Sequence, residues 1–423
     1  MAGRAWKSET YDDEATLTQL VEQHADKATI LKALKGRTWN AVHLKMCKLG
    51  IHHRYNEYNT TPAEDVAEEV KRQDTEAIKK KYHQVVRERA FQDRVIKQLH
   101  EAIVAIPPGP KAKPLPRSIM TGTEEAAVVV ISDPHVGEVV SSDEMSGLGQ
   151  YDFGMFCSYA SFLGQTVVDI TDRLRSGFKI RKLWVPHLGD MVTGLIHEEL
   201  AITADVNPLH AVMGGAFVFA QMFRDWAPHF EEIRVPCVVG NHGRLTKKKR
   251  YKQKYVNWDY VFYTTLMLML QNEPRIKFDI PFSFFHRVDI LGHQHLLMHG
   301  DDIRAWNGVP WYGIKRMVAN LTEILAAHSE YPEYVLLGHF HQAGTLDRYM
   351  GETILNGSWP GGNEYSLGKM AATNEPKQVM YGIHPEKGKT WQFSTNFRFA
   401  DTESKPRYTY DPEAQLACQI QEL

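Results

Sequence analysis

Five short polar segments, each directly after an apolar run, constrain the fold of this chain more than any other feature. The apolar runs have the length and composition of buried strands and cover residues 126–131, 183–185, 235–239, 296–298 and 335–337. The polar segments read Asp133-Pro134-His135, Gly189-Asp190, Gly240-Asn241-His242, His299-Gly300 and Gly338-His339-Phe340-His341. Because residues at the ends of strands in an α/β sheet share one crevice, the sequence predicts an α/β fold in which these side chains meet.

The residue types in these segments indicate a metal centre. They supply seven oxygen and nitrogen ligands and no cysteine, namely Asp133, His135, Asp190, Asn241, His299, His339 and His341. Such ligands suit divalent ions of the Mn, Fe or Zn type. Seven are too many for one ion that must also hold a substrate, whereas they suit two ions sharing one carboxylate, as in two-metal phosphoester hydrolases. We therefore predict two divalent cations, with Mn as the first choice and Fe, Zn or Mg as alternatives.

The ordered set D-x-H, G-D, G-N-H, H-G and G-H-x-H resembles the calcineurin-like metallophosphoesterase superfamily, over roughly residues 126–399. The resemblance implies a two-sheet sandwich flanked by helices and a hydroxide that bridges the metals and attacks phosphorus. It assigns one ion to Asp133, His135 and His341, and the second to Asn241, His299 and His339. Asp190 would bridge the ions, and His242 would protonate the leaving oxygen or steady the phosphoryl group. Within the superfamily, the analogy is closest to DNA double-strand-break repair exonucleases.

Two departures from the usual pattern of this family affect His242 and its surroundings. The residue after the G-N-H histidine is commonly Asp or Glu, and here it is Gly243. The common G-D-x-x-D/N becomes a segment that ends in Thr193. Neither departure removes a metal ligand, but both weaken the case for His242 as an acid.

A small helical module is expected at residues 12–53, with a third helix that begins after Thr38 and ends near Gly50. This third segment resembles the last helix of helix-turn-helix modules in DNA-handling proteins. Val42, Met46 and Leu49 would pack inward, and the expected DNA-contacting residues are Thr38, Asn40, His43 and Lys45. The alternative is a module for protein docking or dimerisation.

The remaining sequence divides at changes of composition. We expect a long helical arm at 60–105, either as a coiled coil or packed on the next domain, and a stiff Pro-rich linker at 106–120. The metallophosphoesterase domain would cover 121–400, with helices over 153–174, 209–226, 256–271 and 314–327 and late strands over 344–348, 352–355 and 378–384. A polar tail would occupy 401–423.

A run of basic residues leaves the segment that carries His242. Arg244 to Lys254 contains no acidic residue, and we assign nucleic-acid contacts to Arg244, Lys247, Lys248, Lys249 and Arg250. The alternative interpretation is a solvated loop with no ligand.

Bulk composition limits the classes of function. The net charge of −2 excludes a globally basic nucleic-acid binder, so local patches would have to carry any such contact. The start of the chain lacks the apolar core of a secretory signal, and no run reaches the length of a membrane span. The four cysteines lie far apart, which favours reduced, mostly buried thiols over bridges or ligands. We expect a cytoplasmic protein of a bacterial or phage-infected cell, without a membrane partner.

These features together predict a dimetal-dependent phosphodiesterase that hydrolyses nucleic acid, with DNA as the expected substrate. One alternative is a phosphomonoesterase acting on proteins or nucleotides, which needs no amino-terminal module. A second is a DNA-binding adaptor that keeps the domain as a scaffold, although that predicts eroded ligands. A homo-oligomer or an accessory ATPase partner is compatible with the sequence.

Overall fold

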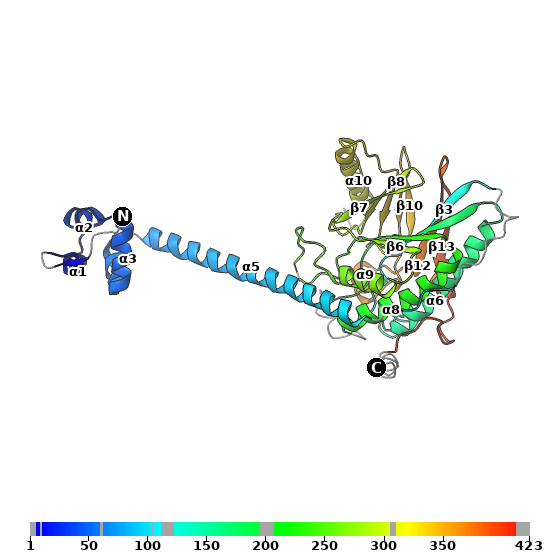
Figure 1. Ribbon diagram of the computed structural model, residues 1–423, viewed down its shortest axis with the longest axis horizontal. Coiled ribbons are helices and arrows are strands. Elements are labelled where there is room, and N and C mark those ends of the chain that lie inside the picture. The colour runs from blue at the N-terminus through cyan, green and yellow to red at the C-terminus, as the bar shows by residue number, and fades with distance from the viewer. Residues whose placement is uncertain are drawn as a thin grey trace. The chain divides into compact units, whose positions relative to one another are not determined.

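Two mixed β-sheets form the centre of the larger part of the chain. The computed structural model describes residues 6–8, 11–59, 62–103, 105–110, 122–194, 207–246, 248–304 and 310–411. One sheet has six strands in the order β13-β12-β3-β4-β5-β6, and the other has five in the order β10-β11-β9-β8-β7. Figure 1 shows helices α6, α8 and α9 on one side of these sheets and α10 on the other. The predicted α/β class with two sheets and flanking helices is confirmed.

Within each sheet, the strands that precede the polar segments run parallel to one another. In the six-stranded sheet, β3 (Glu124–Val129), β4 (Lys179–Trp184), β5 (Glu232–Pro236) and β6 (Ile276–Asp279) run parallel to one another. In the five-stranded sheet, β8 (His293–Met298), β9 (Tyr334–Leu337) and β11 (Glu352–Leu355) do the same. Antiparallel strands complete both sheets, namely β7 (Phe285–Ile290), β10 (Gly344–Asp347), β12 (Lys377–His384) and β13 (Gly388–Asn396).

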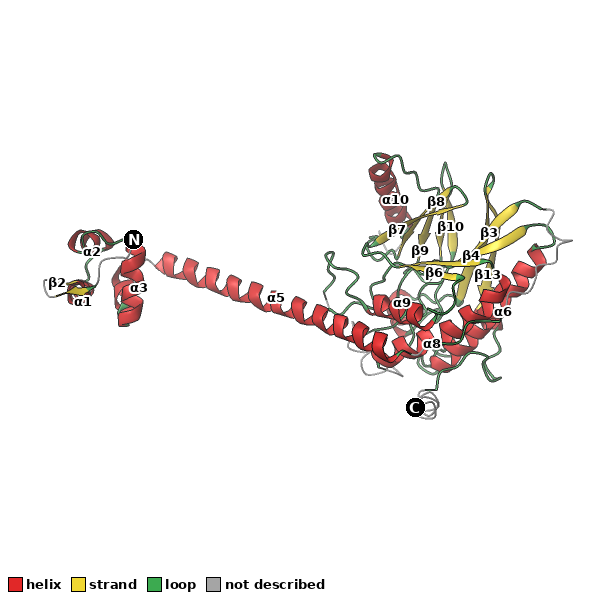
Figure 2. Ribbon diagram, viewed as in Figure 1, coloured by secondary structure: helices red, strands yellow, loops and turns green. Residues whose placement is uncertain are grey.

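Alternation of side chains along the strands divides the interior into three apolar layers. On β3, Ala127 and Val129 face the helices, whereas Ala126 and Val128 face the second sheet. The outer face of the five-stranded sheet packs against α10 through Val335 and Leu337. The result is a helix–sheet–sheet–helix sandwich, as the red helices and yellow strands of Figure 2 show.

Four of the helices cover the sheets at the places that the sequence predicts. They are α6 (Phe153–Leu174), α8 (Pro208–Trp226), α9 (Trp258–Met269) and α10 (Trp311–Ala326). A short helix that was not predicted, α11 (Glu364–Met370), begins with a capping box at Asn363. The 3-10 turns η2 (Ala227–His229) and η3 (Phe397–Phe399) follow α8 and β13. None of the helices in the described ranges combines the length and apolar character needed to cross a bilayer.

The chain divides into two units, residues 1–87 and residues 88–423. The first unit contains the short pair β1 (Lys7–Ser8) and β2 (Tyr11–Asp12), followed by helices α1 (Asp13–Glu22), α2 (Lys27–Ala33), α3 (Trp39–Leu49) and α4 (His52–Asn59). Its core consists of Leu17, Val21, Ile30, Leu34, Val42, Met46, Ile51 and Tyr55. The sequence predicted three of these helices; α4 is an addition, and Tyr55 fixes it to the core.

The long helix α5 (Pro62–Ala102) begins in the first unit and ends in the second. Near its end, the Gln92 side chain donates hydrogen bonds to the backbone oxygens of Tyr255 and Asn257. Val95 and Ile96 pack on the core of the second unit. In this last part, therefore, the arm is a helix packed on its own chain, which is one of the two predicted alternatives.

The segments on either side of the predicted catalytic domain are held by its helices. Ile106 donates its backbone N–H to Met269, and Gly109 donates to the Glu273 carboxylate. The rest of the predicted linker, from residue 111, lies outside the described residues. In the predicted tail, Tyr408 is buried and its hydroxyl donates to Asp225 of α8. The tail thus closes the core as far as residue 411, the last described residue.

Candidate metal centre

The five polar segments follow the carboxyl ends of parallel strands in both sheets. Asp133 follows β3, Asp190 follows β4 and Asn241 follows β5, while His299 follows β8 and His339 follows β9. Parallel pairing continues past the strand ends, because Ile131 bridges to His187 and His187 bridges to Cys237. The two sheets therefore deliver their loops to one edge of the sandwich, where open α/β sheets place their ligands.

One group of side chains brings together Asp133, His135 and His341, whose ligand atoms lie within 4.8 Å of one another. The Nε2 atoms of His135 and His341 are 3.1 Å apart. The Nε2 atom of His341 is 3.4 Å from Oδ1 of Asp133. This is the group that the family resemblance assigns to one ion.

A second group brings together Asp190, His299 and His339 within the same 4.8 Å limit. The Nε2 atom of His299 lies 3.0 Å from Oδ2 of Asp190 and 3.1 Å from Oδ1 of Asn241. Asp190 also groups with His135 and His242. Its carboxylate therefore stands between the two groups, which is the position expected of a bridging ligand.

The donor atoms fit divalent cations. Nδ1 of His135 and Oδ2 of Asp190 are two of the buried atoms of the described residues that have no hydrogen-bond partner, because the 3.0 Å contact of Oδ2 with Nε2 of His299 lacks hydrogen-bond geometry. Leaving such groups unpaired is costly unless something outside the chain satisfies them. The Nδ1 atom of His299 donates to the backbone oxygen of Leu188 at 2.7 Å. This bond fixes the tautomer that leaves Nε2 as a lone-pair donor, as in protein metal sites.

Five of the seven predicted ligands have left-handed backbone conformations. The φ angles are 53° at Asp133, 45° at His135, 52° at Asp190, 69° at His339 and 55° at His341. Only a few per cent of non-glycine residues adopt positive φ. Strain of this kind persists where the surrounding structure imposes it, and it gathers at functional sites. The strained backbone of the turns after the strands is therefore the conformation that makes these side chains converge.

Burial and mutual charge set the protonation of the centre. Burial alone would lower the pKa of His299, but the carboxylates of Asp190 and Asp133 outweigh burial and raise the pKa to about 10. At His135, burial and the neighbouring imidazoles of His242 and His341 hold the pKa well below its ordinary value. The neutral imidazole is the form that binds a metal, so a cation at Nε2 of His299 would take the place of the proton that the two carboxylates stabilise there.

A buried carboxylate that sequence reasoning missed supports two of the loops. Asp259 accepts hydrogen bonds from the backbone N–H groups of Asp190, Met191 and Gly240, at 2.7–2.9 Å. It thereby ties the β4 loop to the β5 loop. In the sequence Asp259 is only an acidic residue in the first turn of α9, a common position, so no local signal separates it from other helix-start acids.

Glu138 is a second missed residue beside the centre. Its Oε2 atom lies 3.6 Å from Nδ1 of His135, and its Oε1 atom accepts a hydrogen bond from Asn363. Burial raises the pKa of Glu138. A carboxylate behind a ligand imidazole orients the ring, so Glu138 is a positioning residue for His135.

His242 lies at the edge of the centre. Its backbone N–H donates to Oδ1 of Asp190 at 2.7 Å, and its Nδ1 atom is 3.3 Å from the backbone oxygen of Thr193. The His242 ring stands edge-on to that of His135, with centroids 4.6 Å apart. A side chain at Gly243 would place Cβ 2.1 Å from Oδ1 of Asn257. The position after His242 thus has no room for the side chain of Asp or Glu. The polar partner of the His242 ring is the backbone oxygen of Thr193 instead.

The basic loop, residues 244–256, connects the G-N-H segment to α9. Its Lys249 and Lys254 side chains form ion pairs with Asp301 and Asp302, which follow His299-Gly300. Arg244 donates to the backbone oxygens of Asn241 and Thr246.

The other predicted contacts of this loop differ in exposure. Lys248 is exposed and Arg250 is half-buried, while Lys247 lies outside the described residues. Two of the loop's lysines thus fix the loop beside the metal centre, and Lys248 faces solvent.

The predicted contact residues of the first unit also divide into two kinds. Thr38 accepts a hydrogen bond from Ala41 and caps α3, and Lys45 forms an ion pair with Glu14. Asn40 is exposed and His43 half-buried. Thr38 and Lys45 thus serve the fold of the module itself.

No protein-family model matches the chain, and no curated protein matches it. Matching solved structures include a novel archaeal phosphodiesterase, at 12% identity over 64% of this chain and 99% of its own, with a TM-score of 0.29. Vps29 from Entamoeba histolytica, complexed with Zn²⁺, has 11% identity over 64% and 99%, with a TM-score of 0.26. A predicted phosphoesterase from Streptococcus pneumoniae TIGR4 has 11% identity over 65% and 100%, with a TM-score of 0.27.

Two facing sheets and the convergence of all five motif segments agree with the resemblance to calcineurin-like metallophosphoesterases that the sequence indicates.

Proposed function

We propose that this chain is a dimetal-dependent phosphodiesterase that hydrolyses nucleic acid, with DNA as its substrate. The observation that carries the proposal is the meeting of seven oxygen and nitrogen side chains from five strand ends, with Asp190 shared between two groups. Two divalent ions bound there would supply an activated water and positive charge for the phosphoryl oxygens. Asp133, His135 and His341 would hold one ion, and Asn241, His299 and His339 the other.

His242 has the position of a proton donor in this proposal. With Nδ1–H donating to the Thr193 oxygen, Nε2 of the doubly protonated ring is the atom that would pass a proton to a leaving alkoxide, which leaves the ring neutral. The contact between the His242 backbone and Asp190 keeps the imidazole at a fixed place relative to the bridging carboxylate. His242 therefore acts on the leaving group and needs no bond to an ion.

The choice of nucleic acid as substrate rests on two features of the chain. The basic loop begins three residues after Asn241, so a polyanion that reaches the centre passes Lys248 and the exposed ring of Tyr251. Lysines and aromatic rings bind backbone phosphates and bases of nucleic acids. The amino-terminal module, with its resemblance to helix-turn-helix modules, would add a second contact.

The test compares four substrates with the full chain in Mn²⁺: labelled single-stranded DNA, labelled double-stranded DNA, a chromogenic phosphodiester and a chromogenic phosphomonoester. We expect cleavage of DNA and of the diester. The variant Asp190→Asn, purified in parallel, should lose this activity, because it removes the shared carboxylate. Activity at the wild-type rate in this variant would refute the role of Asp190 as the shared ligand.

The other outcomes identify the alternatives. Turnover of the monoester alone, with DNA left intact, would overturn the nuclease proposal and indicate a phosphomonoesterase. Binding of DNA without turnover of any substrate in Mn²⁺, Zn²⁺, Fe²⁺ or Mg²⁺ would indicate an adaptor that uses the domain as a scaffold.

A further inference from the structure

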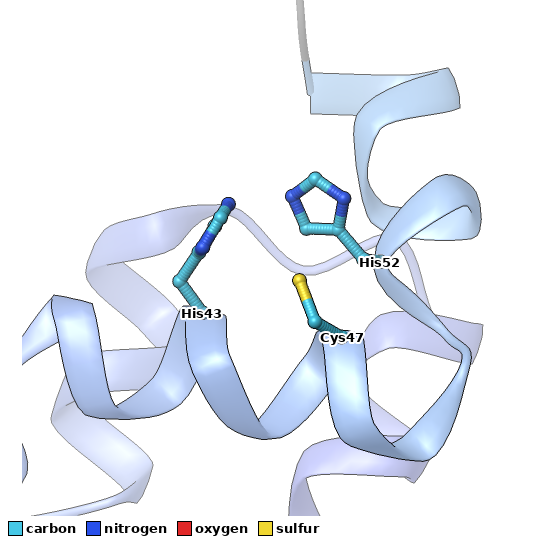
Figure 3. Close-up of side chains that lie close together, drawn as sticks. All are labelled: His43, Cys47 and His52. Carbon is cyan, nitrogen blue, oxygen red and sulfur yellow. The ribbon is translucent and has the colours of Figure 1, made fainter. Parts of the chain in front are cut away.

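Two histidines and a cysteine meet in the amino-terminal unit, far along the chain from the predicted centre. His43 and Cys47 lie on α3, and His52 is the first residue of α4. One ligand atom from each lies within 4.8 Å of the others. Figure 3 shows His43 and Cys47 rising from one side of α3, with His52 turned toward them.

The local backbone explains how these residues meet. His43 and Cys47 are four residues apart on a helix and so lie one above the other on the same face. The adjoining face, about 100° round the helix axis, carries Val42 and Met46, which are buried in the core of the module. Two of the three residues therefore lie on a helix that the core of the module holds in place.

The turn after α3 brings His52 back over that face. Gly50 adopts φ 71°, its N–H donates to the Cys47 oxygen, and the Ile51 N–H donates to the Met46 oxygen. These are the two bonds of a Schellman motif. Ile51 packs into the module core, so the first residue of α4 is held above the last turns of α3.

The exposure of the set suits an ion with an open coordination position. Cys47 is exposed, although the sequence favoured mostly buried thiols, and both histidines are half-buried. The His43 and His52 rings stand edge to face, with centroids 4.3 Å apart. Ligand atoms around a tetrahedral Zn²⁺ are roughly 3.5 Å apart, given Zn–S and Zn–N bonds of about 2.3 and 2.0 Å. The ligand atoms of the three residues lie within 4.8 Å of one another. Small χ rotations of these surface side chains can shorten the separations to the spacing around the ion.

We propose that His43, Cys47 and His52 form a Zn²⁺ site that joins α4 to α3. Thiolate and imidazole are ligands that zinc prefers, whereas the predicted catalytic centre has no sulfur and suits harder ions. Binding releases the Sγ proton of Cys47 to solvent, and the thiolate, two imidazoles and a water complete four positions. This site is independent of the proposed phosphodiesterase activity, and it gives His43 a role other than contact with DNA.

Cobalt distinguishes the two sites, because Co²⁺ bound to a thiolate has a near-ultraviolet charge-transfer band that oxygen and nitrogen ligands do not give. We would titrate the reduced full chain with Co²⁺ and then displace it with Zn²⁺. The wild type should show the band and bind one ion more per chain than Cys47→Ser. The band should disappear in Cys47→Ser and on addition of Zn²⁺.

Two histidine substitutions and one matched control complete the experiment. His43→Ala and His52→Ala should each weaken the band-forming affinity by about 100-fold or more, the upper end of losses seen even for outer-shell partners of metals. His53→Ala removes an exposed histidine outside the cluster and should leave the affinity unchanged. A wild type without the band at saturating Co²⁺, a band that persists in Cys47→Ser, or an equal loss in His53→Ala would overturn the proposal.

Discussion

Replacing Gly240 with alanine tests whether the position of Asp190 controls the centre. The Gly240 backbone adopts a conformation open to alanine, so the change introduces only a methyl group. That methyl carbon would lie 2.1 Å from Oδ1 of Asp190 and 2.4 Å from its backbone nitrogen. No ligand is removed and no charge changes, which makes the perturbation purely steric.

The structure gives the size of the expected effect. Because nonbonded atoms rest at about 3.5 Å, the Asp190 carboxylate must retreat by roughly 1.4 Å or the two loops must part by that amount. Either movement breaks the hydrogen bond from the His242 backbone to Asp190. Misplacement of a reacting group by about 1 Å costs on the order of 100-fold in rate. Overpacking itself should lower the free energy of unfolding by about 1–3 kcal/mol.

Calorimetric titration with Mn²⁺ would measure the affinity and number of ions, and diester hydrolysis would measure kcat. We expect weaker binding of both ions and a loss of about 100-fold in kcat. The matched control is Gly344→Ala, since a methyl group there meets nothing within 4 Å. A folded Gly240→Ala protein with wild-type affinity for two ions and unchanged kcat would refute the assignment of Asp190 as the shared ligand.

Three further predictions concern single side chains. His242→Ala should keep both ions while kcat falls by about 10²–10⁴-fold, as for loss of a general acid; loss of the ions as well would contradict its role. Burial lowers the pKa of His295 to about 3, so only the unfolded imidazole takes up a proton below pH ~6.5, and stability falls by about 1.4 kcal/mol per pH unit toward pH 3. Urea titrations should show a flatter decline for His295→Phe, and an unchanged slope would show that the buried ring is not the cause. Asp302→Asn should leave Lys249 and Lys254 with less of their charge neutralised, so DNA should bind more tightly. The slope of log K against log salt concentration should become steeper by about one. Weaker binding would mean that the ion pairs themselves shape the DNA site.

The parts of the fold that the sequence predicted are those with strong periodic signals. The apolar runs before Asp133 and Asp190 identify buried parallel strands, and the carboxyl-end rule then places their polar segments together. Helix α6 was predicted with its observed ends because Asp152 caps it and apolar residues recur at helical spacing. Strands β7 and β13 were missed because much of their length is exposed or half-buried, which leaves a weak alternation.

The missed parts of the candidate site depend on contacts that join distant segments. Asp259 supports Asp190 across 69 residues, and Glu138 becomes notable only when Asn363 lies beside it. The ion pairs of Lys249 likewise require the β8 loop to lie next to the basic loop. Helix α4 was missed because its sequence is polar apart from two tyrosines, whereas in the structure Tyr55 packs into the core of the module.

The left-handed turns that present the ligands have a thermodynamic consequence for the metal-free chain. Each non-glycine residue in that conformation costs about 1 kcal/mol or more, so five of them together approach the ~5–15 kcal/mol that keeps a domain folded. Bound ions would offset this loss of folding free energy, because they bind only the arrangement of side chains that the turns create. Chelators should therefore raise hydrogen exchange first in these loops, well before the sheets behind them open.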